Sequence, residues 1–235
     1  MKTFVINLKR RSDRRNYMEV VLPPSLNPEF TTDWEAPTDG KDINAIALDG
    51  YGVFSWQINS TNPWWNRPLW KGEVGCAVSH WLCWKKALES DDNLFLFLED
   101  DIYFSHGTWD TLDDGIRRIS RYDPEWELLY LGRTPNDVDT FAIMGIVKPG
   151  YSYDSHAYLL TKSGVEKAIT TNFCNSIVPV DEFLPAMYID HPREDVRKRY
   201  PKCMSAYAFE PPLAYQLSKS LATSDVKENV EFFIP

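Results

Sequence analysis

Five consecutive apolar residues, 94–98, end abruptly in three adjacent carboxylates, Glu99, Asp100 and Asp101. An unbroken apolar run bounded by charge is typical of a strand buried on both faces of a sheet. In open α/β sheets, ligands bind beyond the carboxyl ends of the strands, so we expect these acids at a ligand site. Three neighbouring like charges need a counter-ion, and Mg²⁺ or Mn²⁺ prefers carboxylate oxygens. The alternative is an acidic turn that only ends a strand.

Length and composition indicate one globular domain. A chain of 235 residues with 43% hydrophobic content can bury a sizeable core. A formal charge of -9 argues against general nucleic-acid binding, which needs a basic surface. The apolar start, residues 3–8, is too short for a signal peptide, and no apolar run is long enough to cross a bilayer. We therefore expect a soluble protein without a membrane span, in the cytoplasm.

Hydrophobic periodicity predicts alternating strands and helices. Strands are expected at residues 3–8, 94–98, 127–131 and 156–161, and helices up to Pro23 and at residues 72–89, 108–121, 162–171 and 180–189. The alternation predicts an α/β fold with a mainly parallel central sheet flanked by helices, similar to a Rossmann fold. Neither a G-x-G-x-x-G nor a P-loop motif is present. Residues 23–70 are expected to form long loops with short strands, and the tail from residue 217 a loop or a lid.

The cysteines and histidines do not suggest zinc. Cys76 and Cys83, seven residues apart, are expected to be buried free thiols on one helix. The chain has 4 Cys and 4 His without a paired metal-binding spacing, so a zinc site is not expected.

Six strings occur in one order along the chain and together resemble glycosyltransferase family 25, most closely its procollagen galactosyltransferase branch. They are VINLKRRSDRR from Val5, APTDGK from Ala36, KGEVGCAVSH from Lys71, LEDD from Leu98, LYLGR from Leu129 and VPVDEFLP from Val178. The resemblance implies a GT-A type fold, a UDP-sugar donor and Mn²⁺, with Mg²⁺ possible. It also implies galactose transfer from UDP-galactose to the hydroxyl of hydroxylysine in collagen-like chains.

Three other functions stay open. Bacterial members of the family that build lipopolysaccharide are similar and transfer galactose or glucose. A catalytically silent sugar-nucleotide-binding domain keeps the fold without the reaction. The acidic cluster alone would also permit a metal-dependent nucleotidyltransferase or phosphohydrolase. Within a single domain over residues 1–235, we expect residues 1–133 mainly to bind donor and metal, and residues 134–235 to hold the acceptor side and the base.

The resemblance assigns roles to several groups of residues. Glu99 and Asp101 stand where such families carry a D-x-D motif and are expected to ligate the metal, with Asp101 as the first choice. Asp225 is expected as an additional metal or donor contact, and Gln216 is a weaker alternative. Arginines at a helix N-terminus suit phosphate oxygens, although a solvated helix face would also explain them. His80 is either a donor contact or a satisfied buried histidine. The complete donor-binding set comprises Asn7, Leu8, Arg10, Arg14, Asp39, Gly40, Lys71, Ser79, His80 and Asp100.

Asp181 and Glu182 begin a predicted helix. Acidic residues favour helix N-termini electrostatically, and this alone would explain them. The functional interpretation is that one of them accepts the proton of the acceptor hydroxyl during a single, inverting displacement. Asp181 is the first choice for this base and Glu182 the second.

An aromatic cluster precedes the helix at residues 72–89. Flat rings suit sugar faces and extended peptides, but aromatic residues in loops often only pack the loop onto the body. We expect packing for most of them and keep Trp64 and Trp65 as candidates for an acceptor groove. The cluster consists of Tyr51, Phe54, Trp56, Trp64, Trp65 and Trp70.

Overall fold

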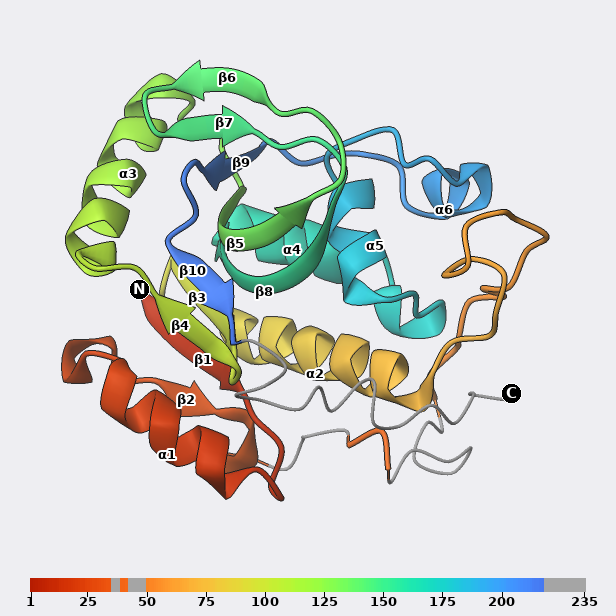
Figure 1. Ribbon diagram of the computed structural model, residues 1–235, viewed down its shortest axis with the longest axis horizontal. Helices are drawn as coiled ribbons and strands as arrows, with labels where there is room; N and C mark the ends of the chain where they lie inside the picture. Colours follow the sequence, from red (N-terminus) through yellow and green to blue (C-terminus); the bar gives the residue numbers. More distant parts are fainter. Residues whose placement is uncertain (35–38, 42–49, 218–235) are drawn as a thin grey trace.

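The computed structural model describes residues 1–34, 39–41 and 50–217. Within them, an eight-stranded sheet has the order β2-β1-β3-β8-β5-β9-β7-β6, and β10 and β4 form a separate two-stranded ribbon (Figure 1). The strands are β1 (Lys2–Ile6), β2 (Glu29–Phe30), β3 (Leu94–Glu99), β4 (Ile102–Phe104), β5 (Leu128–Pro135), β6 (Thr140–Ile143), β7 (Ile146–Lys148), β8 (Ser152–Thr161), β9 (Ala206–Phe209) and β10 (Ala214–Gln216). The α-helices are α1 (Ser12–Val21), α2 (Lys71–Leu88), α3 (Thr108–Tyr122), α4 (Lys162–Thr170), α5 (Val180–Ala186) and α6 (Glu194–Arg199), and the 3-10 helices are η1 (Pro24–Leu26), η2 (Thr31–Asp33) and η3 (Phe173–Asn175).

The expected α/β fold is confirmed, and the sheet is mainly parallel in strand direction. Strands β2, β1 and β3 pair in parallel, and so do β5 and β9. Strand β8 lies antiparallel between β3 and β5, and β7 lies antiparallel between β9 and β6. Only β8 and β7 therefore run against the other strands of this sheet. Because β8 separates β3 from β5, neither of them has a parallel partner on that side.

The central strands carry two hydrophobic cores, one on each face of the sheet. On β3, Phe95 and Phe97 face the core shared with α2, α4 and α5, whereas Leu96 and Leu98 face the core shared with α1 and α3. This is the alternation that a strand buried on both faces must show. It also fixes the direction of the acids that follow, because Glu99 continues the α2 side and Asp100 the α1 side.

The predicted elements are present, and several boundaries differ. Helix α5 ends at Ala186 rather than residue 189, and Pro185 lies in its last turn, where the proline ring removes one N–H donor of the helix. Strand β8 begins at Ser152, four residues before the predicted start. The β6–β7 hairpin and helix α6 were not predicted, because both are short.

The cysteines agree with expectation. All four are free thiols, with Cys83 fully buried and Cys76 half-buried on α2. Among the described helices, none combines the length and apolar character that crossing a bilayer requires.

Truncating Phe97 should destabilise the fold strongly. Its side chain is 0% exposed and stacks between Phe4 and Tyr158, at ring centroid distances of 5.6 and 5.2 Å. Phe97→Ala is expected to lower the free energy of unfolding by about 3–5 kcal/mol, because it leaves a cavity at the centre of the sheet. Denaturant unfolding measures this change in the free energy of unfolding. Val20→Ala, at a side chain 83% exposed on α1, is the control and should change little.

Candidate functional site

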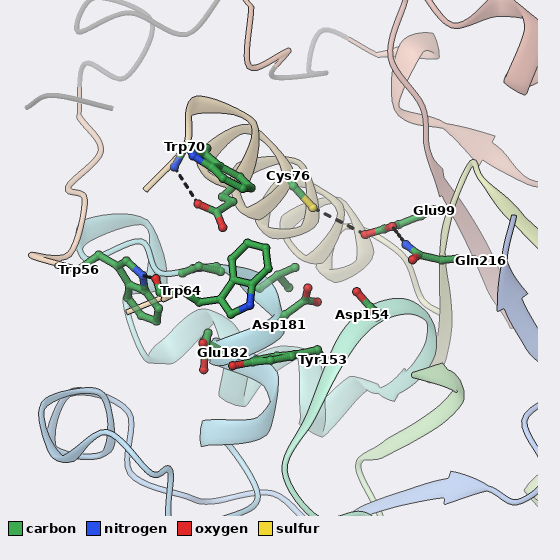
Figure 2. Close-up of a pocket in the computed structure, with 13 residues that line it drawn as sticks. Trp56, Trp64, Trp70, Cys76, Glu99, Tyr153, Asp154, Asp181, Glu182 and Gln216 are labelled. Atoms are coloured by element: carbon green, nitrogen blue, oxygen red, sulfur yellow. Dashed lines mark hydrogen bonds between the residues drawn. The ribbon is translucent and has the colours of Figure 1, made fainter. Parts of the chain in front are cut away.

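A pocket opens at the carboxyl end of β3, between α2, β8 and the start of α5 (Figure 2). Its walls come from six parts of the chain: the loop before α2, the first turns of α2, the end of β3, the first half of β8, the start of α5, and the end of β10. The lining residues are Trp56, Trp64, Trp70, Glu73, Cys76, Glu99, Tyr153, Asp154, Pro179, Val180, Asp181, Glu182 and Gln216. The pocket is therefore acidic and aromatic, and none of these lining side chains is a lysine, arginine or histidine.

Three carboxylates point toward the same space in this pocket. Figure 2 shows Glu99, Asp154 and Asp181 converging from β3, β8 and α5. Asp181 accepts a hydrogen bond from the Ser155 backbone N–H at 2.8 Å, and Asp154 accepts one from the Thr134 hydroxyl at 2.7 Å. These bonds hold two carboxylates at fixed positions inside the pocket.

Asp154 has a left-handed backbone, with φ of 58°. A non-glycine residue rarely adopts this conformation, and such strain is concentrated at functional sites. It coincides with the irregular register between β5 and β8, which lies between Gly132 and Thr134 on the β5 side. The irregularity aims Asp154 into the pocket.

One group of described side chains brings together enough ligand atoms for a metal ion. Cys76, His80 and Glu99 each offer one ligand atom, and these atoms lie within 4.8 Å of one another. Glu99 Oε1 lies 3.7 Å from Cys76 Sγ and 3.5 Å from His80 Nε2. On the other side, the Gln216 side-chain amide donates to Glu99 Oε2 at 3.4 Å. The group can therefore hold a cation at the edge of the pocket.

His80 is fully buried and one of its ring nitrogens is satisfied. Its Nδ1 lies 2.8 Å from the Tyr158 hydroxyl, which also accepts a hydrogen bond from Trp84 Nε1 at 3.0 Å. Its Nε2 has no hydrogen-bond partner among the described residues and faces Glu99. Burial lowers the pKa of His80 to about 4, so the ring is neutral near pH 7 and Nε2 is the atom left for a ligand.

Burial and mutual repulsion raise the pKa values of the pocket acids. The pKa of Glu99 rises because the side chain is desolvated, and the charge of Asp154 adds to this. For Asp181, burial and then the charge of Glu99 raise the pKa to about 7. An acid with a pKa near the working pH suits general base catalysis.

Asp100 and Asp101 lie on the other side of β3, around Arg14 from α1. Arg14 Nη1 lies 2.7 Å from Asp100 Oδ1 and 3.4 Å from Asp101 Oδ2. The Asn7 amide donates to Asp100 Oδ2 at 2.7 Å. Burial raises the pKa of Asp100 to about 6 despite Arg14, so this side chain is still mostly ionised at neutral pH. Neither acid lines the pocket that contains Glu99.

Several predicted donor-binding residues gather where β1 ends and α2 begins. Arg10 Nε pairs with Asp39 Oδ2 at 2.6 Å, and Arg11 N–H donates to the Leu8 carbonyl at 2.8 Å. A Cβ added to Gly40 would lie 2.7 Å from the Cα of Gly72, so the loop around Gly40 packs directly on the first turn of α2, beside Lys71.

Two further predicted residues are Ser79 and Asp225. Ser79 is buried and its hydroxyl donates to the Gly75 carbonyl of its own helix at 2.8 Å. Asp225 lies outside the described residues.

Glu182 is buried and accepts hydrogen bonds on both oxygens. Trp65 Nε1 donates to Oε1 at 3.0 Å, while the Tyr151 hydroxyl at 2.5 Å and His191 Nε2 at 2.8 Å donate to Oε2. Its neighbour Asp181 faces the open part of the pocket (Figure 2).

Sequence reasoning named His80 only as a donor contact or a satisfied buried histidine, and it assigned no site role to Cys76 or Asp154. Cys76 and His80 are four residues apart on a helix, which places both on one face, and this signal was available. Asp154 follows an unremarkable tyrosine-rich stretch, and its role depends on the backbone irregularity in β8. Of the aromatic residues, Trp56 is buried, Trp64 is 40% exposed and lines the pocket, and Trp65 bonds to Glu182.

Comparison with known proteins agrees with the resemblance found in the sequence. Residues 1–184 match the family model of glycosyltransferase family 25 (LPS biosynthesis protein). The chain is 32% identical to human procollagen galactosyltransferase 2, over 90% of this chain and 34% of that protein. It is 31% identical both to procollagen galactosyltransferase 1 of Danio rerio, over 91% of this chain and 36% of that protein, and to human inactive glycosyltransferase 25 family member 3, over the same shares.

The chain thus spans about a third of the length of these curated relatives. Among solved structures, apo mouse xyloside xylosyltransferase 1 aligns with a TM-score of 0.30 at 9% identity, over 88% of this chain and 82% of that one. That likeness is too weak to support an inference. The family match covers most of the chain, including the strand end that carries Glu99 and the helix that carries Asp181. This chain belongs to glycosyltransferase family 25.

Proposed function

We propose that this protein is an inverting, metal-dependent transferase that moves galactose from UDP-galactose to the hydroxyl of hydroxylysine in collagen-like chains. The observation that carries the proposal is the convergence of Glu99 and Asp181, from distant parts of the sequence, on one pocket. The names of the procollagen galactosyltransferases support the sugar and the acceptor. Residues 1–133 would mainly hold the donor, and residues 134–235 the acceptor side and the base.

The reaction needs one base and no protein nucleophile. The acceptor oxygen attacks the anomeric carbon as the bond from that carbon to the diphosphate oxygen breaks, and UDP leaves with the bonding electrons. Asp181 accepts the proton of the attacking hydroxyl. Its raised pKa and its position on the open side of α5 suit it to this role better than the enclosed Glu182.

The ligand atoms of Cys76, His80 and Glu99 fit a divalent cation. Glu99 supplies a carboxylate oxygen and His80 a neutral imidazole nitrogen, both of which Mn²⁺ accepts, and Cys76 adds a softer sulfur that Mg²⁺ disfavours. When bound, such an ion neutralises the charge that develops on the diphosphate leaving group. Asp101 and Asp225 remain proposed ligands. Gln216 is already bonded to Glu99 and would orient that carboxylate.

The donor would lie along the edge formed by the end of β1 and the start of α2. Asn7 and Leu8 directly follow β1 there, and Gly40 packs beside Lys71. Arg10 and Lys71 supply positive charge toward the phosphates. Arg14 and Asp100 would act behind this edge, because both are buried.

A silent sugar-nucleotide-binding domain is the second candidate. The specific observation in its favour is that a human relative named as inactive is as similar to this chain as one named as a transferase. Catalysis and binding without transfer must therefore be separated by experiment.

Incubation with sugar nucleotides should separate the candidates. UDP-galactose, UDP-glucose and UDP-N-acetylglucosamine are each supplied with free hydroxylysine, in Mn²⁺ or in EDTA, and released UDP and the glycosylated amino acid are measured. We expect metal-dependent release and galactosyl-hydroxylysine from UDP-galactose. Binding of UDP-sugar without release would support the silent domain, and cleavage between the phosphates would overturn a transferase.

Glu99→Gln should weaken metal-dependent UDP binding. The substitution removes the one charged ligand of the Cys76, His80 and Glu99 group but keeps its shape. Calorimetry with UDP, with and without Mn²⁺, should show the metal-dependent gain in affinity for the wild type and its loss in the variant. Asp113→Asn, on the exposed face of α3, is the charge-matched control. An equal metal effect in Glu99→Gln would place the ion elsewhere.

Asp181→Asn should remove transfer and spare UDP binding. Loss of a general base typically lowers the rate about 10²–10⁴-fold. Single-turnover transfer to hydroxylysine, together with UDP affinity, checks both parts. Retained transfer would assign the base to another residue.

Asp181→Asn should also stabilise the metal-free protein at higher pH. The ordinary pKa of 3.8 rises to about 7 in the folded state, so the folded protein holds this proton more tightly than the unfolded chain. Asp181 therefore opposes folding increasingly as pH rises from about 4 to about 7, and asparagine removes this cost. In EDTA, the Tm of the variant should exceed that of the wild type above about pH 7, with the two converging below about pH 4. A pH-independent difference would contradict the shifted pKa.

A further inference from the structure

We infer that Glu182 is a positioning residue that holds the two walls of the acceptor side together. This role presupposes the proposed transfer reaction, because it concerns how that pocket receives its acceptor. Glu182 is 3% exposed, and its carboxylate links groups from three separate parts of the chain. The donors are Trp65 Nε1, the Tyr151 hydroxyl and His191 Nε2.

The proton positions around Glu182 follow from its partners. His191 Nδ1 accepts the Arg193 backbone N–H at 3.1 Å, which places the ring proton on Nε2, directed at Glu182. Burial and the charge of Glu182 raise the pKa of Tyr151, so its hydroxyl keeps its proton and donates it. Trp65 can only donate. Glu182 is thus an acceptor for three fixed donors, and a carboxylate so occupied is poorly placed to receive a substrate proton.

The first wall is the loop over residues 50–70, called the aromatic loop below. Backbone hydrogen bonds anchor its start: Phe54 N–H donates to the Ile177 carbonyl at 2.9 Å, and Ile177 N–H to the Gly52 carbonyl at 2.7 Å. Its end is fixed at the start of α2, where Glu73 accepts the Trp70 N–H at 2.7 Å.

Between these anchors, side chains hold the aromatic loop. Trp65 bonds to Glu182, and Arg193 donates to the Trp56 carbonyl at 2.7 Å while stacking over the Trp56 ring. Trp56 Nε1 in turn donates to the Trp64 carbonyl at 3.0 Å. Trp64, next to Trp65, therefore presents its ring to the pocket from a segment whose position depends on Glu182.

The second wall is the start of β8. Tyr151 contacts Glu182 and also lies 3.0 Å, hydroxyl to hydroxyl, from Tyr153, which lines the pocket. Glu182 thereby connects Tyr153 on one wall with the aromatic loop on the other, and Asp181 lies beside it on α5 (Figure 2). Flat aromatic faces suit a sugar ring or an extended peptide. We therefore assign Trp64, Trp70 and Tyr153 to acceptor contact, with Glu182 setting their spacing.

Two variants break the same hydrogen bond from opposite ends. In Glu182→Gln, an amide oxygen can still accept from Tyr151 and His191, but the NH₂ group then faces the Trp65 N–H. Trp65→Phe removes that N–H and keeps a ring. Trp109→Phe on α3 is the matched control, because Trp109 packs on Phe104 and does not line the pocket. The three variants and the Glu182→Gln/Trp65→Phe double variant are compared with the wild type.

Steady-state kinetics give the KM for hydroxylysine, which is compared with the kcat and with the KM for UDP-galactose. Glu182→Gln and Trp65→Phe should each raise the acceptor KM about tenfold, with the donor KM within about twofold, as expected for loss of one charge-assisted hydrogen bond. The double variant should be no worse than the more severe single variant, because both act on one interaction. A fall of about 10²–10⁴-fold in kcat for Glu182→Gln alone, which Trp65→Phe does not reproduce, would make Glu182 the base and overturn its positioning role.

Hydrogen exchange tests the same role without turnover. Amides of residues 55–66 should exchange faster in both single variants than in the wild type, and those of α2 should not change. Unchanged exchange in Glu182→Gln would overturn the role even if the transferase is active. Conversely, if the wild type transfers no sugar, the proposed function fails, and faster exchange would still support Glu182 as the tether of the aromatic loop.

Discussion

The site depends on how the acids at the end of β3 are distributed between the two faces of the sheet. Alternation along β3 sends Glu99 toward α2 and Asp100 toward α1, where Arg14 pairs with Asp100 and also approaches Asp101. Arg14 is itself buried, so its guanidinium compensates carboxylates that solvent cannot reach. The negative charge of Glu99 is left without such a partner. Glu99 lines the pocket, and in the proposed function a metal ion would compensate its charge.

The rest of the pocket adds further negative charge. Asp154 and Asp181 add two carboxylates, and the lining side chains include no basic residue to neutralise them. Repulsion and desolvation raise the pKa values of Glu99 and Asp181, which means that the folded protein bears an electrostatic cost in its metal-free form. A bound cation would relieve that cost. Under the proposed function, the arrangement that destabilises the metal-free protein would favour binding of a metal ion and a diphosphate.

Sequence periodicity predicted most of what positions the site, because the long amphipathic helix α2 and the apolar strand β3 each carry a strong pattern. It failed where the outcome depends on long-range pairing. The direction of β8 is set by its neighbours β3 and β5, and the left-handed Asp154 arises from the irregular register within that pairing. Neither leaves a local signature. The Cys76 and His80 pair was readable from helix spacing, but its use needs Glu99 from another element to complete the group.

Asp181 and Glu182 show the same limit at the scale of one helical turn. Adjacent residues on a helix point about 100° apart, so the two acids meet different surroundings although both line the pocket, and the sequence does not state which of them is enclosed. The hydrogen-bond partners determine which acid is enclosed. Trp65, Tyr151 and His191 bond to Glu182, and all three lie outside α5, at least nine residues away in the sequence. A buried carboxylate that accepts three hydrogen bonds gives rigidity, whereas one with an open side and a raised pKa can exchange a proton. Neighbouring acids of like chemistry therefore have different surroundings, and the roles proposed for them differ for that reason.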